Sequence, residues 1–299
     1  MDLQVVEQVA ELGAWVAEGG VVVLSGAGLS TDSGIPDYRG PSGSARRSTP
    51  MTYQTFTRDP VARRRYWARS HLGWRTIGEA RANDGHRAVA ALQSRGAVDG
   101  IVTQNVDGLH QAAGARDVVE LHGNLARIVC LDCGDLTPRE MLAKRLDEAN
   151  PAFDASAVAI NADGDAELDD TDLDGFRVVD CEGCGGMLKP DVVYFGETVP
   201  PGRVARSFEL VESARTLLVL GSSLTVMSGR RFVLRAVREG VRVAIVNRGV
   251  TRGEPYAKLH IDAPLGIVLP HLAGELSAPV HIGPTREASL PGLYRTETL

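Results

Sequence analysis

The chain has 299 residues, of which 43% are hydrophobic, and its formal net charge is −6. This length supports a sizeable core, either in one large domain or in a domain that carries an insertion. The negative charge is local, because residues 163–174 hold seven acidic side chains and no basic one. The rest of the chain is close to neutral, which argues against a nucleic-acid-binding surface.

No apolar run approaches the ~20 residues that span a bilayer. Asp2, Glu7 and Glu11 stand where a signal peptide would have a basic start. We therefore expect a cytoplasmic protein without membrane or nucleic-acid partners.

The first predicted elements are a helix and a buried strand. Residues 3–18 have apolar side chains at helical spacing, and Gly19-Gly20 ends the pattern. The segment 21–25, which is apolar except for Ser25, then leads into Gly26-Ala27-Gly28. This sequence is typical of a buried parallel strand that ends in a tight turn. Small residues there let backbone N–H groups approach a phosphate, and the N-terminus of a following helix would favour its charge. Gly-x-Gly alone also occurs in turns that serve packing only.

Three segments precede the next strand. Residues 41–50 are rich in Gly, Ser and Arg, and we expect a mobile flap there. Residues 60–79 begin at a proline and have the pattern of a helix. A further helix over residues 86–95 can be capped by Asp84 and closed by Gly96.

Polar residues follow the next two predicted strands. The strand 100–103 runs into Gln104, Asn105 and Asp107, and His122 follows the segment 118–121. Open α/β sheets bind ligands at the carboxyl ends of their parallel strands. We therefore expect these side chains at a binding crevice.

In the second half of the chain, polar or small residues again follow predicted strands. An extended segment covers residues 188–196, strands cover 216–220 and 241–246, and a helix lies between these strands at about 229–238. The two strands end in Gly221-Ser222-Ser223 and Asn247-Arg248-Gly249. Strands that alternate with helices predict an α/β fold with a doubly wound, parallel Rossmann-like sheet. The tail from about residue 279 is rich in Pro, Gly and Thr, and we expect it to be loosely held.

All four cysteines occur in two Cys-x-x-Cys-Gly motifs, which are Cys130, Cys133, Cys181 and Cys184 with their following glycines. Each motif presents two thiolates to one ion, so the pair predicts a zinc site. Two disulfides or a redox pair are the alternatives, which a cytosolic location disfavours. Four thiolates leave no open position, so we expect one structural Zn²⁺.

The long insertion between the two motifs contains the acidic run. Residues 170–175 copy the first half of a calcium-binding loop, but its twelfth position is Cys181 instead of a bidentate glutamate. A solvated acidic loop is therefore the better interpretation.

Taken together, these motifs resemble those of the sirtuins, which are NAD-dependent protein lysine deacylases. The motifs occur in the family's order and cover most of the chain. They are Gly26-Ala27-Gly28-x-Ser30, Gly34-Ile35-Pro36-Asp37-Tyr38-Arg39, Gln104-Asn105-x-Asp107, His122-Gly123, the two Cys-x-x-Cys pairs, Val193-Tyr194-Phe195-Gly196-Glu197, Gly221-Ser222-Ser223 and Asn247. One such motif is a weak signal, whereas the ordered set is specific. Tyr38, the long insertion and Tyr66-Trp67-Ala68-Arg69 are most similar to the class II branch.

The resemblance implies a Rossmann-like NAD-binding domain made of residues 1–40, 79–126 and 187–278. A helical flap module, residues 41–78, and a zinc-ribbon module, residues 127–186, would form a smaller inserted domain. Residues 279–299 would form the loosely ordered tail, and we expect a monomer.

In the implied reaction, the acyl-lysine oxygen attacks C1′ of the nicotinamide ribose and nicotinamide leaves. His122 would be the general base on a ribose hydroxyl, because an unperturbed imidazole titrates near the working pH. Asn105 and Asp107 would hold the ribose and the nicotinamide. The alternative for His122 is a buried histidine satisfied by the backbone, and we keep that interpretation for His71, His86, His110, His260 and His271.

The resemblance also implies the binding residues. Those for NAD are Gly26, Ala27, Gly28, Ser30, Asp37, Tyr38, Arg39, Gln104, Asn105, Asp107, Gly221, Ser222, Ser223, Asn247, Arg248, Gly249 and Leu265. Val193, Tyr194, Phe195, Gly196 and Glu197 would offer an extended edge to which an acyl-lysine peptide adds as a strand.

Two questions about the activity stay open at this point. Tyr66 and Arg69 share one helix face, and sirtuins that remove acidic acyl groups carry Tyr-x-x-Arg at this position. An aromatic side chain packed beside a surface arginine is the alternative. A protein mono-ADP-ribosyltransferase, or a deacylase that prefers acidic or longer acyl groups, therefore competes with a deacetylase.

Overall fold

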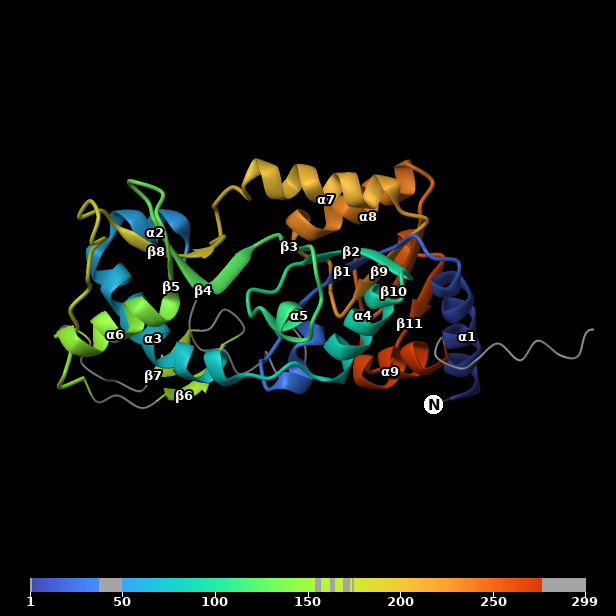
Figure 1. The fold of residues 1–299 in the computed structure, drawn as a ribbon, viewed down its shortest axis with the longest axis horizontal. Helices are drawn as coiled ribbons and strands as arrows, with labels where there is room; N and C mark the ends of the chain where they lie inside the picture. The colour runs from blue at the N-terminus through green and yellow to red at the C-terminus, as the bar shows by residue number, and fades with distance from the viewer. Residues whose placement is uncertain are drawn as a thin grey trace, which may run out of the picture.

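The structure is a computed structural model that describes residues 2–37, 50–153, 157–161, 165–168, 173 and 175–275. It has two lobes side by side (Figure 1). One is built on a six-stranded parallel sheet, and the other contains a three-stranded antiparallel sheet and several helices. The predicted flap, except Pro50, and the predicted tail lie outside the described residues.

The parallel sheet of the large lobe has the strand order β11-β10-β9-β1-β2-β3. The bounds are β1 Val21–Ser25, β2 Val98–Thr103, β3 Val118–Glu120, β9 Thr216–Leu220, β10 Arg242–Val246 and β11 Leu259–Ile261. Ser25 pairs with Thr103 on one side and with Leu220 on the other, so three central strands end at the same level. Because of this register, the loops that follow these strands meet at one edge.

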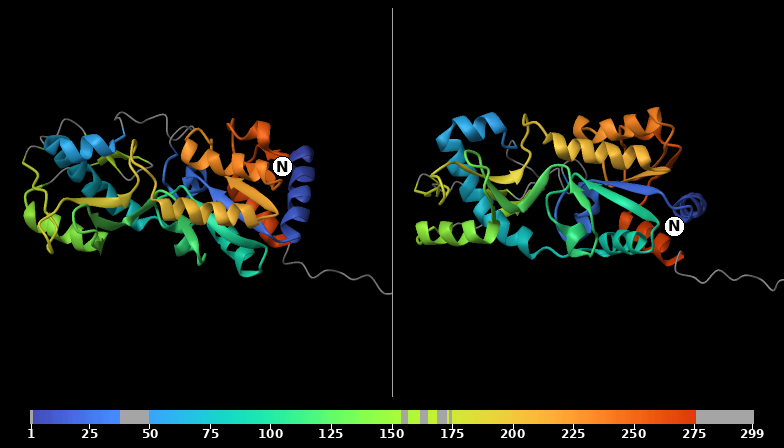
Figure 2. Two further views of the ribbon diagram at one scale, coloured as in Figure 1. Left: turned by 90° about the horizontal axis from the view of Figure 1, so that it is seen from above. Right: turned by 45° about the horizontal axis from the view of Figure 1, so that its top comes forward.

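Helices cover both faces of the sheet (Figure 2). They are α1 (Leu3–Ala17), α4 (Asp84–Ser94) and α9 (Leu265–Glu275) on one face, and α7 (Pro201–Ser213) and α8 (Met227–Arg238) on the other. Successive side chains of a strand point to opposite faces. In β1, Val21 and Val23 accordingly pack with α1, α4 and α9, whereas Val22 and Leu24 pack with α7 and α8. The predicted doubly wound sheet is confirmed.

The small lobe has an antiparallel sheet with the strand order β5-β4-β8. Its elements are β4 (Gly123–Cys130), β5 (Leu136–Pro138), β8 (Leu188–Val192), α2 (Tyr53–Arg58), α3 (Pro60–Glu79) and α6 (Arg139–Ala149). Phe56, Trp67, Ile128 and Leu146 are buried at the centre of this lobe. A hairpin of β6 (Ala157–Ile160) and β7 (Ala166–Leu168) contacts α3.

The acidic run does not behave throughout as a solvated loop. Asp165, immediately before β7, is buried and forms an ion pair with Arg69 of α3. The prediction is therefore wrong for this residue, because a guanidinium on a neighbouring element compensates the buried carboxylate. The side chains of the other acidic residues between 163 and 174 lie outside the described part of the chain.

Two other local predictions differ from the structure. Asn83 caps α4: its Oδ1 accepts from the His86 N–H, and its Nδ2 donates to the Leu29 carbonyl and to Ser33 Oγ. Asp84, the predicted cap, is the first helical residue. After Gly26 the chain forms two short 3₁₀ turns, Ala27–Leu29 and Thr31–Ser33, instead of an α-helix.

None of the helices in the described residues is long and apolar enough to cross a membrane.

The cap assignment predicts the outcome of two substitutions. Asn83→Ala removes the cap and both bonds to the loop of residues 29–33, so we expect it to cost about 1–2 kcal/mol of unfolding free energy. Asp84→Ala removes only an exposed pair with Arg87 and should cost about half a kcal/mol. Urea unfolding monitored by circular dichroism measures both. Equal losses in the two variants would contradict the assignment.

Candidate functional site

A cavity of about 1280 Å³ opens at the carboxyl ends of β1, β2, β9 and β10. It extends to the small lobe, where Tyr66 and Tyr194 line it. The cavity therefore lies where the level strand ends of the large lobe meet the neighbouring lobe.

Most of the predicted site residues line this cavity. They are Gly26, Ala27, Gly28, Asp37, Tyr66, Gln104, Asn105, His122, Val193, Tyr194, Phe195, Gly196, Glu197, Gly221, Ser222, Ser223, Asn247, Arg248, Gly249 and Leu265. Ser30, Asp107 and Arg69 do not line it. Tyr38 and Arg39 lie outside the described residues.

The glycines after β1 and β9 pack directly against each other. A Cβ atom on Gly26 would lie 2.8 Å from the Gly221 carbonyl oxygen, and one on Gly28 would lie 2.9 Å from the Gly221 Cα. Gly221 itself has φ +61°, in the left-handed region. These glycines therefore serve backbone packing, and the backbone that they bring together forms part of the cavity wall.

Asn105 and Asp107 have different positions relative to the cavity. Asn105 Nδ2 donates to the Gly26 carbonyl and to Ser30 Oγ, both at 3.1 Å, which orients the amide at the wall. Asp107 lies behind the wall, where Oδ2 accepts from Ser30 Oγ at 2.6 Å and Oδ1 accepts from the Leu109 N–H. Burial raises the pKa of Asp107. In this structure the Asp107 carboxylate holds Ser30, which in turn accepts from the Asn105 amide at the wall.

His122 lies between β3 and β4, at the point where the chain passes from one lobe to the other. Its Nδ1 lies 3.0 Å from the Gln104 carbonyl oxygen, and its Nε2 lies 2.9 Å from Ser228 Oγ. Because a carbonyl oxygen only accepts, Nδ1 carries the hydrogen and Nε2 is the basic atom. Burial lowers the pKa of His122, and the positive charges of Arg231 and Arg203 lower it further. A neutral imidazole is thus held in the cavity wall.

The next residue, Gly123, explains how the chain can pass there. Its φ is +89°, and a Cβ atom would lie 1.8 Å from the Asp191 carbonyl oxygen. Any other residue would push β4 away from β8 and would displace His122.

A buried set of polar side chains supports the strand ends from below. His110 Nε2 lies 2.8 Å from Ser25 Oγ. Ser25 Oγ donates to Thr103 Oγ1, and Thr103 Oγ1 also accepts from the Asn105 N–H. The ring of His86 packs edge-on against the ring of His110. Both histidines are buried and neither lines the cavity, but His110 is bonded to the side chain of Ser25 and not to the backbone as predicted.

The segment Val193–Glu197 lies at the boundary of the two lobes. The Phe195 carbonyl accepts from the Tyr53 N–H, and the Gly196 carbonyl accepts from Gln54 Nε2. Glu197 Oε2 accepts from the Tyr194 N–H and pairs with the buried Lys189. The segment is therefore extended only at its start: residues 194–197 form a turn in which the Glu197 N–H donates to the Tyr194 carbonyl at 3.1 Å and Gly196 has φ +76°. The extended edge predicted over Val193–Glu197 is wrong for this part, because Gly196 takes the left-handed conformation that the turn requires.

The fold places the two residues of the Tyr-x-x-Arg pattern in different surroundings, and only the tyrosine lines the cavity. Tyr66 lines the cavity and packs edge-on against Tyr194, with ring centroids 5.4 Å apart. Burial raises the pKa values of both phenols, so they stay neutral. Arg69 pairs with Asp165 and does not line the cavity.

Several lining residues were missed by the sequence analysis. They include Thr31, Asp32, Val106, Leu224, Thr225, Val226, Ser228 and Pro264. Thr31 and Asp32 could have been found, because they directly follow the Gly-Ala-Gly turn. Ser228 had no such signal, since a serine near the start of a helix is common.

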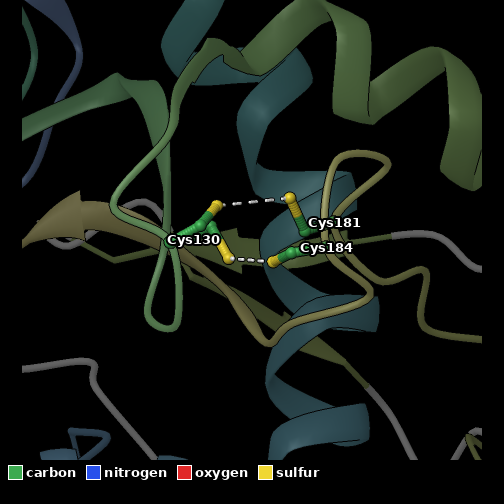
Figure 3. A group of neighbouring side chains, drawn as sticks. Cys130, Cys181 and Cys184 are labelled. Atoms are coloured by element: carbon green, nitrogen blue, oxygen red, sulfur yellow. Dashed lines mark hydrogen bonds between the residues drawn. The ribbon is translucent and has the colours of Figure 1, made fainter.

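The four cysteines form a cluster in the small lobe (Figure 3), and none of them lines the cavity. All four sulfur atoms lie within 4.8 Å of one another, with Cys130 Sγ 3.5 Å from Cys184 Sγ and Cys133 Sγ 3.9 Å from Cys181 Sγ. Zn–S bonds of about 2.3 Å at tetrahedral angles place sulfur atoms about 3.8 Å apart. The cluster thus fits one Zn²⁺ with four thiolate ligands, and none of the cysteines forms a disulfide.

The chain is similar to known proteins over most of its length. The model of the Sir2 family matches residues 26–228. A protein of Streptomyces coelicolor named NAD-dependent protein deacetylase 1 is 63% identical over 258 residues, which is 86% of each chain. A protein of the same name from Mycobacterium avium is 51% identical over 277 residues, covering 91% of this chain and 97% of its own.

Solved structures have the same fold. A structure of Sir2 with a p53 peptide and NAD⁺ superimposes with a TM-score of 0.72 at 28% identity, covering 89% of this chain and 97% of that one. Another, described as showing the basis for the mechanism and regulation of Sir2 enzymes, has a TM-score of 0.71 at 29% identity and covers 90% and 98% of the two chains.

The cysteine cluster predicts a loss of metal and of stability on substitution. Structural zinc contributes about 10–16 kcal/mol to small zinc-binding peptides. We therefore expect Cys184→Ser to contain no stoichiometric zinc by plasma mass spectrometry and to melt at a lower temperature than wild type. Glu182→Ala changes an exposed residue of the same loop and is the matched control. A fully loaded, equally stable Cys184→Ser variant would exclude a four-thiolate site.

The buried histidines predict a loss of stability in acid. Burial lowers the pKa of His86 to about 4 and that of His110 to about 3. An unfolded chain binds these protons near pH 6.5, so the free energy of unfolding falls as the pH falls from about 6.5 to about 4. His110→Gln should lose less stability than wild type over this window, by up to about 3 kcal/mol. Urea titrations at several pH values check this, and parallel curves for the two proteins would refute it.

Proposed function

This chain belongs to the Sir2 family, the sirtuins, and we propose on that basis that it is an NAD-dependent protein deacetylase. It would transfer the acetyl group of an acetyl-lysine side chain to ADP-ribose and release nicotinamide. The observation that carries the proposal is the basic Nε2 of His122 in a cavity that also contains Asn105 and the glycine loop. The names of the relatives at 63% and 51% identity support the same activity.

His122 is the proposed general base. NAD supplies a ribose whose anomeric carbon carries nicotinamide as the leaving group. Nδ1–H is held by the Gln104 carbonyl, which leaves Nε2 to accept a proton from a ribose hydroxyl. Its lowered pKa keeps the ring neutral, and therefore able to accept a proton, at physiological pH.

Orientation and exclusion of water are the other proposed tasks of this chain. Asn105 would hold the ribose, because Gly26 and Ser30 orient its amide and leave Oδ1 as an acceptor. Ser222, Ser223 and the turn at Asn247 would bind the phosphates and the adenosine ribose. Leu265, beside the apolar Ala263 and Pro264, would contact the adenine. Asp107 would act indirectly, through Ser30.

The acyl end of the cavity favours acetyl in this proposal. Tyr66 and Tyr194 present neutral side chains there, and the charge of Arg69 is compensated by Asp165. The peptide would run along the start of Val193–Glu197 as an added strand. A structure of Sir2 that contains a p53 peptide supports a peptide as the substrate.

An assay of coupled products tests this function. With NAD and an acetyl-lysine peptide, we expect nicotinamide, deacetylated peptide and O-acetyl-ADP-ribose in equal amounts by mass spectrometry. His122→Ala should lower kcat by at least about 100-fold. Ser213→Ala, at the end of α7 and bonded only to the Leu210 carbonyl, is the control.

Two other outcomes would replace the proposal. Transfer of label from NAD to protein without any acyl dependence would indicate a mono-ADP-ribosyltransferase. A larger kcat/KM for succinyl-lysine than for acetyl-lysine would indicate a deacylase for acidic acyl groups.

A further inference from the structure

Ser228 is hydrogen-bonded to the basic atom of His122. Its Oγ lies 2.9 Å from Nε2, and the residue lines the cavity from the first turn of α8. The roles assigned above to the lining residues do not include it. A hydroxyl that is hydrogen-bonded to a base must change from donor to acceptor in that bond when the base becomes protonated there.

The direction of this hydrogen bond follows from the other side of the ring. Nδ1–H donates to the Gln104 carbonyl at 3.0 Å, so Nε2 has a lone pair and Ser228 Oγ–H must donate to it. A serine hydroxyl can rotate, and it can accept as well as donate. The same contact can therefore serve the neutral ring and the protonated ring.

The charges around the His122 ring make its hydrogen bond to Ser228 important for the protonated state. The charged groups that act on His122 are Arg203 from α7 and Arg231 from α8, and both oppose a positive imidazole. In the described part of the chain, the ring makes its hydrogen bonds to Gln104 and Ser228, and none to a carboxylate. Ser228 is thus the partner whose oxygen can accept a hydrogen bond from a protonated Nε2.

Ser228 is also held firmly in place. Its carbonyl accepts from Arg231 Nε at 3.1 Å. The next residue, Gly229, packs so closely that a Cβ atom would lie 2.4 Å from Gln104 Oε1. The first turn of α8 therefore packs against the side chain of Gln104, the residue whose carbonyl also accepts from His122.

We propose that Ser228 is a positioning residue for the general base: it donates to Nε2 in the neutral ring and accepts from Nε2–H after His122 has taken a ribose proton. The inference rests on the role of His122 proposed above. In this step the Ser228 hydroxyl first turns its hydrogen away from Nε2, which frees the lone pair of that atom. The ribose O–H bond then breaks and the Nε2–H bond forms on this lone pair, while Ser228 keeps its own proton and its oxygen accepts from Nε2–H.

The hydroxyl should stabilise the protonated ring more than the neutral one. Hydrogen bonds from a charged donor are roughly twice as strong as neutral ones. Removal of the hydroxyl therefore lowers the pKa of His122, and it disfavours the protonated base that forms during the reaction. A difference of about 1.4 kcal/mol between the two protonation states corresponds to one pKa unit and to a tenfold change in rate.

The test compares Ser228→Ala, Ser228→Thr and the control Ser213→Ala. The pKa of His122 is measured by NMR titration of the imidazole Cε1–H, with the signal assigned from its absence in His122→Ala. We expect a pKa about one unit lower in Ser228→Ala, and a value close to wild type in Ser228→Thr, which keeps the hydroxyl. The acidic limb of kcat/KM against pH should move to lower pH in the alanine variant, with kcat about tenfold lower.

The outcomes separate this inference from the proposed function. An unchanged or raised pKa in Ser228→Ala, or a threonine variant that behaves like alanine although it melts like wild type, would overturn the role of Ser228. The NMR titration does not require turnover, so it reads the contact even if wild type fails to deacetylate. A wild-type protein that releases no nicotinamide with acetyl-lysine peptides would instead overturn the function.

Discussion

The close contact between the backbone at Gly26–Gly28 and Gly221 is the constraint on which the site depends. Because β1, β2 and β9 end at one level, the loops after them meet, and only residues without a side chain allow the approach that is seen. That contact places the Gly26 carbonyl where Asn105 Nδ2 can reach it, and through Ser30 it also holds Asp107. The cavity wall is therefore a consequence of strand register and of three glycines.

The second requirement is a fixed relation between the lobes. Arg127 of β4 pairs with Glu120 of β3 at 2.7 Å and with Asp191 of β8 at 2.9 Å, and Arg203 of α7 also pairs with Asp191. These partly buried ion pairs connect strands of the small lobe to elements of the large one. His122 lies between β3 and β4, inside this set of contacts. The network therefore keeps the imidazole in register with both Gln104 and Ser228.

Regular patterns predicted the fold well, and long-range partners explain the errors. Residues 21–25 and 216–220 are strands as predicted, because both faces are buried and each run has four consecutive apolar residues. Pro60 starts its helix as predicted. Asn83 caps α4, whereas Asp84 was the predicted cap. The Asn83 side chain also donates to Leu29 and Ser33, which are distant in sequence. Arg69 forms an ion pair with Asp165 and does not line the cavity. Ser228 contacts His122 because α8 packs beside the end of β2. No local motif contains these pairings.

The cysteine cluster joins β4 and β8, and the opposite ends of these two strands lie next to His122. β4 begins next to His122 and ends at Cys130, while β8 begins shortly after Cys184 and ends beside Val193, whose N–H donates to the His122 carbonyl at 2.8 Å. Metal-bound thiolates are open to attack by oxidants and by electrophiles. An agent that releases the ion would loosen both strands at once and so impair turnover from a distance. Such an inhibitor would be non-competitive with NAD, and the effect of an oxidant that forms disulfides would be reversed by reductant together with fresh zinc.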